Sequence, residues 1–252
     1  MEHICKNCGS THVGKYCNQC GQIVFTDRFT IKHFTHNFFD KVFDLENGLF
    51  FTMYRILISP HKVVSEYVSG ITKKYTNPAK FAVYLIGFFT IVMLKFNYID
   101  ISVKGVNELM DLNYSDTLKA TNVIINFVKD YFQFFTLLYL PFFALASHWL
   151  YRKYNYTEHL ILHCYVYSLI SVLSIAFILF DEYLIISNVI VFLLVMTFYT
   201  ITFRRLFNSS VFVSFIKSIT FYVLAQILIS ITFLIITFLY AIIHKNLTGS
   251  FF

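Results

Sequence analysis

Four cysteines near the N-terminus have the residue type and the spacing of a metal site. They form two CxxC pairs, Cys5 with Cys8 and Cys17 with Cys20, and a glycine directly follows each pair. Structural zinc prefers four such ligands in a tetrahedron, and each CxxC turn supplies two of them. The spacing therefore predicts a Zn²⁺ site, with an iron–sulfur or redox site as the alternative.

A site of this kind is structural, because four protein ligands leave no open position on the metal for a substrate. Two roles remain open for the segment that carries it. It is either a small docking surface for a protein partner or for a second copy of the chain, or a segment too short to hold a core, which the metal merely folds.

A second group of residues that could do chemistry consists of His148, Glu158, His159 and His163. His159 and His163 are four positions apart, so on a helix they share one face at a spacing suitable for metal ligands. One interpretation is a catalytic or metal site between two antiparallel helices. The other is packing at the membrane interface, with Glu158 at a helix N-terminus. The HxxxH pair stands without further histidine motifs, which favours the second interpretation.

The composition indicates that these residues belong to a membrane protein. The 252 residues are 57% hydrophobic, 20% aromatic and 13% charged, with a mean hydropathy of +0.63. Soluble domains carry about 25% charged residues. The pattern predicts an all-α membrane protein with about five transmembrane helices, over about 80–98, 131–151, 160–180, 183–203 and 218–243.

The basic residues indicate the orientation of these spans. With the N-terminus inside, fifteen of the twenty Lys and Arg residues fall on the inner side. We therefore expect a bacterial inner membrane protein with a cytoplasmic N-terminus and a periplasmic C-terminus. The net charge of +6 is then a topological signal and a contact with anionic lipid, and no nucleic-acid partner is expected.

Three zones follow along the chain: a zinc ribbon at 1–22, amphipathic helices at 23–78 and the transmembrane domain at 79–252. One amphipathic helix is expected over 31–45, and Ser59-Pro60 and Gly70 mark the start and stop of a short helix. These helices either lie on the membrane surface or pack as a soluble bundle.

Three stretches together resemble a known family. They are the ribbon CKNCG…GKYCNQCGQ, the segment from Leu45 to Phe81, and the segment YRKYNYTEHLILHCYVYS at 151–168. The chain resembles the uncharacterised bacterial membrane proteins of domain-of-unknown-function family 3667, frequent in Bacteroidetes. The residues that carry the two later motifs are Thr52, Leu57, Pro60, Tyr67, Gly70, Tyr75, Pro78, Glu158, His159 and His163. The resemblance implies a zinc-ribbon membrane protein and supplies no reaction.

We expect a non-enzymatic membrane scaffold whose ribbon recruits a partner or a second copy. The alternative is a membrane metalloenzyme or transporter that uses the group around His159.

Overall fold

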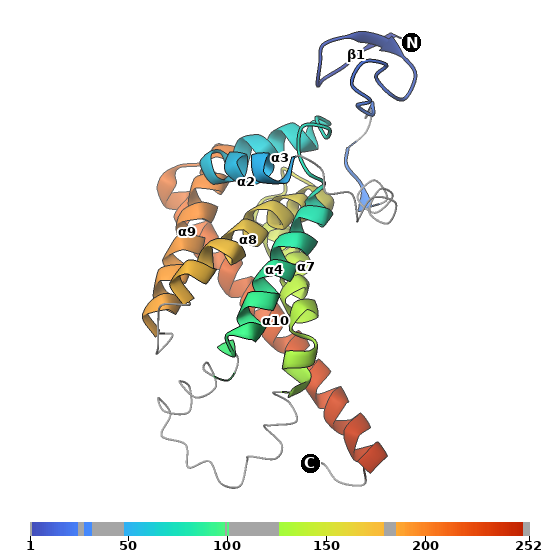
Figure 1. The fold of residues 1–252 in the computed structure, drawn as a ribbon. Coiled ribbons are helices and arrows are strands. Elements are labelled where there is room, and N and C mark those ends of the chain that lie inside the picture. Colours follow the sequence, from blue (N-terminus) through green and yellow to red (C-terminus); the bar gives the residue numbers. More distant parts are fainter. Residues whose placement is uncertain are drawn as a thin grey trace.

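A computed structural model describes residues 2–24, 28–31, 48–98, 100, 126–178 and 185–248. The amphipathic helix expected over 31–45 lies almost wholly outside these described residues. The chain forms a small N-terminal domain above a bundle of helices, with the C-terminal end at the opposite end of the bundle (Figure 1).

The N-terminal residues 2–24, called the cysteine domain below, contain two short strands. Strand β1 (Glu2–Ile4) pairs antiparallel with β2 (Thr11–Val13), with His3 opposite His12. An isolated bridge between Tyr16 and Ile23 closes a second loop beside this hairpin.

Two short helices lie across the end of the bundle that faces the cysteine domain (Figure 1). They are α2 (Leu49–Ile58) and α3 (Pro60–Val68), which Ser59 separates. Pro60 occupies the first position of α3, where its missing N–H costs no hydrogen bond. Gly70 follows the end of α3 with φ +104°, and the N–H groups of Gly70 and Ile71 bond back to the last turn, as in a Schellman motif.

Helix α2 buries Thr52 and Ile56 against the bundle and turns a second, apolar face outward. Phe50 is 81% exposed and Tyr54 60% exposed on that face. An aromatic face of this kind is what a helix at a membrane interface presents. The placement of the helices at 23–78 on a membrane surface remains a prediction.

Five long apolar helices follow, and each is long enough to cross a membrane. They are α4 (Pro78–Lys95), α7 (Phe132–Leu150), α8 (Tyr156–Ile178), α9 (Ile185–Phe207) and α10 (Val211–Thr248). Successive helices run in opposite directions (Figure 1). The chain is thus an all-α, multi-pass membrane protein, as the composition predicted.

Two helices extend beyond the membrane spans expected near them. Helix α8 begins at Tyr156, where Asn155 and Glu158 cap its first turn. Helix α10 begins at Val211, and Lys217 lies within it. The Lys217 ammonium bonds the Leu150 carbonyl at 3.2 Å and lies over the Tyr151 ring, so the charge has protein partners at the end of the bundle.

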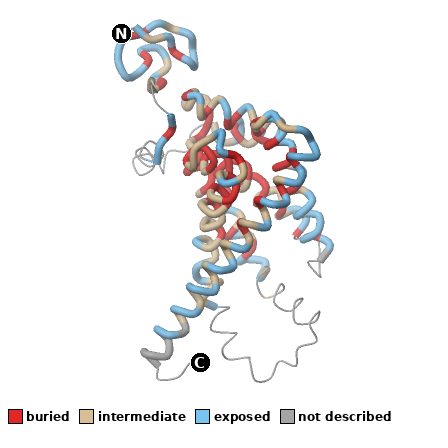
Figure 2. Tube along the Cα trace, turned by 180° about the vertical axis from the view of Figure 1, so that it is seen from behind, coloured by how far each residue is buried: buried red, intermediate tan, exposed pale blue. Residues whose placement is uncertain are grey.

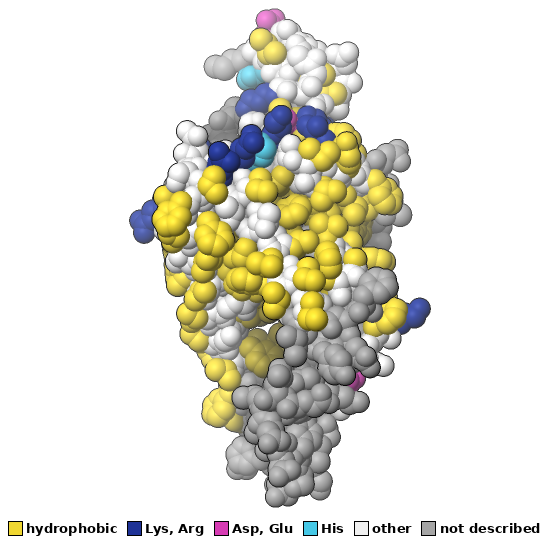
Figure 3. Space-filling view, turned by 90° about the vertical axis from the view of Figure 1, so that its left-hand side faces the viewer, with side chains coloured by type: hydrophobic (Ala, Val, Ile, Leu, Met, Phe, Trp, Pro, Cys, Tyr) yellow, Lys and Arg dark blue, Asp and Glu magenta, His cyan; other side chains and the backbone are white. Residues whose placement is uncertain are grey.

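Helix α8 lies at the centre of the bundle and packs against α2, α3, α4, α7 and α9. Buried residues lie on every face of its first half, which is typical of a helix surrounded by others. Buried residues gather in the half of the bundle next to α2 and α3, whereas the far part of α10 is exposed (Figure 2). A broad apolar surface lies below a band of Lys and Arg side chains near the cysteine domain (Figure 3).

Candidate functional site

The four cysteine side chains of the cysteine domain meet at one point. Their sulfur atoms all lie within 4.8 Å of one another. The Sγ atoms of Cys5 and Cys20 are 3.6 Å apart, as are those of Cys8 and Cys17. A tetrahedral Zn²⁺ with Zn–S bonds of about 2.3 Å places its sulfurs about 3.8 Å apart, so the cluster has the size that such an ion requires.

The two CxxC turns have the same backbone structure. The N–H of Gly9 bonds the Cys5 carbonyl at 2.9 Å, and the N–H of Gly21 bonds the Cys17 carbonyl at 2.8 Å. Both glycines have positive φ, +76° and +67°, which side chains with a Cβ rarely adopt. Glycine follows each CxxC pair because the turn requires positive φ at that position.

Ser10 supports the cluster from the side. Its Oγ lies 3.0 Å from the Cys8 sulfur and 3.1 Å from the Cys17 sulfur. The Ser10 hydroxyl, and next the backbone N–H of Cys20, lower the pKa of Cys17 to about 5. The pKa of Cys8 is also lowered, with the Ser10 hydroxyl as its largest cause, whereas that of Cys5 is raised to about 11. Because the thiolate is the form that binds metal, Cys8 and Cys17 are the two thiols that give up their protons most readily to a cation. The four cysteines can hold a metal ion, and their soft sulfur donors suit zinc or iron.

The cysteine domain is fixed to the loop that follows α3. The side chain of Gln22 is buried, and its amide nitrogen donates to the Gly70 carbonyl at 2.6 Å. Its amide oxygen accepts from the backbone N–H groups of Thr72 and Lys73 at 3.1 and 2.9 Å. Since Gln22 directly follows the second cysteine turn, the metal cluster and the attachment share one segment.

A second attachment joins the segment after the cysteine domain to the start of α8. Arg28 binds the Glu158 carboxylate with two N–H groups, at 2.8 and 3.2 Å, and donates to the Lys153 carbonyl at 2.9 Å. The Glu158 side chain is 3% exposed, whereas that of Arg28 is 61% exposed. Phe29 is buried beside Tyr67, with the ring centroids 5.5 Å apart.

Glu158 also forms a capping box with Asn155. The Asn155 side-chain oxygen accepts from the Glu158 N–H at 2.9 Å, and a Glu158 carboxylate oxygen accepts from the Asn155 N–H at 2.8 Å. Each side chain thus satisfies a backbone donor that the helix start leaves unpaired. The contacts of Glu158 are those of a helix cap and an ion pair.

His159 and His163 lie in a buried hydrogen-bond network with Ser147 of α7. The Ser147 hydroxyl oxygen is 2.9 Å from His159 Nδ1 and 2.8 Å from His163 Nε2. The other ring nitrogens are also occupied: His159 Nε2 is 2.8 Å from the Tyr151 carbonyl, and His163 Nδ1 is 2.9 Å from the Tyr199 hydroxyl. Ser147, His163 and Tyr199 are 0% exposed.

His148 lies beside this network without a direct hydrogen bond to it. Its ring is edge-on to His159 at a centroid distance of 5.6 Å, and its Nδ1 is 3.1 Å from the Tyr154 carbonyl. The structure therefore brings the three histidines together, while Glu158 turns to Arg28. In the described part of the chain, the cysteines form the one group of three or more ligand atoms that could hold a metal.

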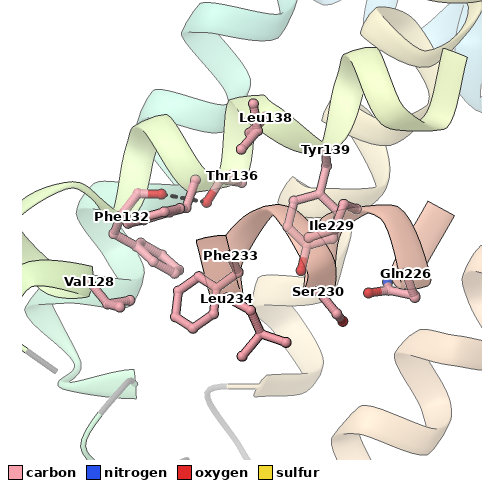
Figure 4. A pocket seen from close by; sticks show the side chains of 11 residues that line it. Val128, Phe132, Thr136, Leu138, Tyr139, Gln226, Ile229, Ser230, Phe233 and Leu234 are labelled. Atoms are coloured by element: carbon pink, nitrogen blue, oxygen red, sulfur yellow. Dashed lines mark hydrogen bonds between the residues drawn. The ribbon is translucent and has the colours of Figure 1, made fainter. Parts of the chain in front are cut away.

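A cavity of about 460 Å³ lies elsewhere, between α7 and α10 (Figure 4). Its wall is mostly apolar and includes Thr136, Tyr139, Gln226 and Ser230 as polar residues. The Thr136 hydroxyl already bonds the Phe132 carbonyl of its own helix at 2.8 Å. None of the residues that the sequence singled out lines this cavity.

Sequence reasoning missed Ser10, Gln22, Arg28, Ser147 and Tyr199. The Asn155-x-x-Glu158 pattern could have revealed the capping box, because it is the signature of a helix start. Ser147 and Tyr199 lie in apolar spans, and their types and spacing give no signal of a shared partner.

Comparison with known proteins adds one finding. The sequence model of a family described as Protein of unknown function (DUF3667) matches residues 46–90. This stretch is similar to that family and covers α2, α3 and most of α4. No curated protein and no solved structure matches the chain.

Proposed function

We propose that this chain is a scaffold protein of the bacterial inner membrane, without enzymatic activity. Its cysteine domain binds one structural Zn²⁺ and holds a protein partner at the cytoplasmic face. The observation that carries the proposal is the closed cluster of four cysteine sulfurs in a domain fixed to the bundle by Gln22. A metal with four protein ligands has no position for a substrate, so the domain acts through its surface.

That surface contains apolar side chains that the chain itself does not cover. Ile4 is 74% exposed, Val13 64% and Tyr16 61%. In the antiparallel register Ile4 pairs with Thr11 and Glu2 with Val13, so Ile4 and Val13 share one face of the hairpin. Exposed apolar and aromatic residues on a small rigid domain are typical of a protein-binding surface.

The charge distribution supports a cytoplasmic location for the cysteine domain. Arg204, Arg205 and Lys62 lie at the same end of the bundle as α3. Their proximity is seen in the pKa of His61, which is lowered by burial and by the charges of Arg205 and Lys62. Basic residues gather on the cytoplasmic side of inner membrane proteins. Reporter fusions at the C-terminus should therefore show a periplasmic location, and a cytoplasmic signal would reverse the proposed orientation.

The histidine group is the basis of the rival function, a membrane metalloenzyme or transporter. In the structure all four ring nitrogens of His159 and His163 have hydrogen-bond partners, and Glu158 is bound by Arg28. These contacts support a structural role in the bundle. The rival predicts metal beyond one ion per chain.

The test measures metal content and partner capture for purified full-length protein in lipid nanodiscs. The Cys17→Ser/Cys20→Ser variant should fall from one zinc per chain to none and lose cross-linking to its partner from a photoreactive residue at position 13. It should remain in the membrane fraction. Cys164→Ala is the matched control, because this fifth cysteine is buried in α8 away from the cluster. Unchanged cross-linking in the double variant overturns the scaffold proposal, and a second metal per chain that survives it supports the rival.

A further inference from the structure

When both histidines are neutral, only one arrangement of protons makes all four side-chain contacts around Ser147 hydrogen bonds. A backbone carbonyl accepts hydrogen bonds and cannot donate them. His159 Nε2 must therefore carry the proton that is donated to the Tyr151 carbonyl. Its Nδ1 is then an acceptor, and the Ser147 hydroxyl donates to it.

The same reasoning continues to α9. Because Ser147 has one hydroxyl proton and gives it to His159, its oxygen accepts from His163 Nε2–H. His163 Nδ1 is then an acceptor, and the Tyr199 hydroxyl donates to it. All four hydrogen bonds point the same way, from Tyr199 in α9 through α8 and α7 to the connection after α7.

Ser147 has a second acceptor within reach. Its Oγ lies 3.2 Å from the carbonyl oxygen of Ala144 on its own helix. If the hydroxyl turns to Ala144, the Ser147 oxygen can accept from Nδ1–H of His159 and from Nε2–H of His163 at once. The network then holds one additional proton, on His159, without the displacement of any heavy atom.

Protonation of His163 has no comparable arrangement. The additional proton would occupy Nδ1 of His163, which already accepts from Tyr199, so the Tyr199 hydroxyl would need a new acceptor. The two histidines are therefore not equivalent. His159 is also the one that lies nearer the end of the bundle, with His148 edge-on to it at 5.6 Å.

Aromatic rings on the network also suit a positive charge. The Phe207 ring stacks on His159 at a centroid distance of 5.8 Å and an interplanar angle of 20°. The face of an aromatic ring attracts a cation at this distance.

No carboxylate offsets the charge directly. In the described part of the chain no ion pair joins either histidine to an acid, and the Glu158 carboxylate is bound by Arg28. The charged groups on the described helices packed around the network and on the segments beside them include Arg28, Arg55, His61, Lys62, Glu66, Lys80, Lys95, His148, Arg152, Lys153, Glu158, Arg204, Arg205 and Lys217, and the nearest other titratable groups are Tyr151, Tyr154, Cys164, Tyr167 and Tyr199. Most of the charged groups are basic, and the Phe221 ring stacks on His163 at 5.6 Å much as Phe207 stacks on His159. The choice of His159 therefore rests on the hydrogen bonds.

From this geometry we infer that His159 is a buried proton-binding site in the membrane domain, which takes up a single proton as the Ser147 hydroxyl turns from His159 to Ala144. The site links α7, α8 and α9 through one exchangeable ligand, the proton. It is independent of the zinc site and of the scaffold role.

The inference is tested by NMR on full-length protein in nanodiscs with ¹⁵N-labelled histidine, titrated from about pH 8 downward until the protein unfolds. His159→Asn and His163→Asn variants assign the signals. At high pH both rings should be neutral with the proton on Nε2. On acidification His159 alone should become doubly protonated while His163 keeps its neutral form.

Ser147→Ala should lower the ratio of doubly to singly protonated His159 by about tenfold or more at the same pH, because the acceptor for Nδ1–H is lost. Ser147→Thr keeps the hydroxyl and should give a protonation ratio of His159 close to that of the wild type. Ser171→Ala is the matched control, since that hydroxyl bonds the Tyr167 carbonyl of its own helix. A proton on Nδ1 of either neutral ring, joint protonation of both rings, or no protonation of His159 before the protein unfolds overturns the inference, even if Ser147→Ala does not fold.

Discussion

The guanidinium group of Arg28 holds the Glu158 carboxylate across 130 positions of the sequence, with Nη2 2.8 Å from Oε2. The same carboxylate caps the first turn of α8 through the Asn155 N–H. One buried side chain therefore fixes both the start of the central helix and the segment that leads to the cysteine domain. These two tasks can be separated by substitution.

Glu158→Gln should be tolerated and Glu158→Ala should not. The single side-chain oxygen of glutamine can still accept from the Asn155 N–H and from Arg28, whereas alanine removes the cap and leaves Arg28 with only the Lys153 carbonyl. A lost cap alone costs about 1 kcal/mol. We expect Glu158→Ala to lower the thermal midpoint in detergent by several degrees and Glu158→Gln to stay near wild type. If Gln abolished a measured activity while the thermal midpoint stayed unchanged, Glu158 would be catalytic instead.

Gln22→Ala should loosen the attachment of the cysteine domain without loss of its metal. The four hydrogen bonds from the Gln22 side chain to Gly70, Thr72 and Lys73 disappear, while the four cysteines remain. Hydrogen–deuterium exchange should therefore rise in residues 70–73, with zinc content unchanged. Gln19→Ala is the control, because Gln19 is exposed in the same cysteine turn. Equal exchange in the two variants would argue against this attachment.

Ser10→Ala should weaken metal binding while leaving the cluster in place. Its hydroxyl lies within hydrogen-bond distance of two of the four sulfurs. Loss of such a supporting group typically lowers metal affinity by about 10–100-fold. Competition with a chromophoric chelator measures this affinity, and Thr11→Ala, at an exposed neighbouring position, serves as the control. An unchanged affinity would show that Ser10 only packs beside the sulfurs.

The contact of Glu66 with Lys74 and Tyr75 should make stability depend on pH. Burial alone would raise the pKa of Glu66, but the hydrogen bonds from Lys74 and Tyr75, both 2.6 Å, lower it overall. A carboxyl with a lowered folded-state pKa stabilises the fold above its unfolded-state pKa of about 4.3, and this contribution is lost as the pH falls through the folded-state pKa.

Wild type should therefore lose more thermal stability below about pH 5 than Glu66→Gln does. Thermal unfolding followed by intrinsic fluorescence at several pH values measures the difference. Glu2→Gln, at an exposed position, should behave as wild type. Parallel curves for wild type and Glu66→Gln would contradict the role of this pair.

The sequence was sufficient for the parts of the fold that depend on local composition. Long stretches without charge predicted five membrane helices, because a bilayer demands about twenty apolar residues from each. The Gly70 stop and the Pro60 start follow from local backbone preferences, and the structure has both.

Contacts between distant segments could not be predicted in this way. Arg28 precedes Glu158 by 130 positions, and Ser147 meets Tyr199 only through His163. Nothing in the type or spacing of these residues indicates that they share a partner. Glu158 was expected at a helix N-terminus, but its pairing with Arg28 has no local signal, and neither has the contact of Lys217 with Leu150.

The length of α10 links the protein to the thickness of its membrane. With 38 residues it is about 57 Å long, and its apolar stretch of 30 residues is about 45 Å. The hydrocarbon core of a bilayer is about 30 Å thick. The oblique course of α10 in Figure 1 is one way to fit such a stretch, since tilting shortens its span across the bilayer. In a thicker bilayer α10 would tilt less, and its angle to α7 and α9 would change. The length of the lipid chains would then affect how the helices of the bundle pack.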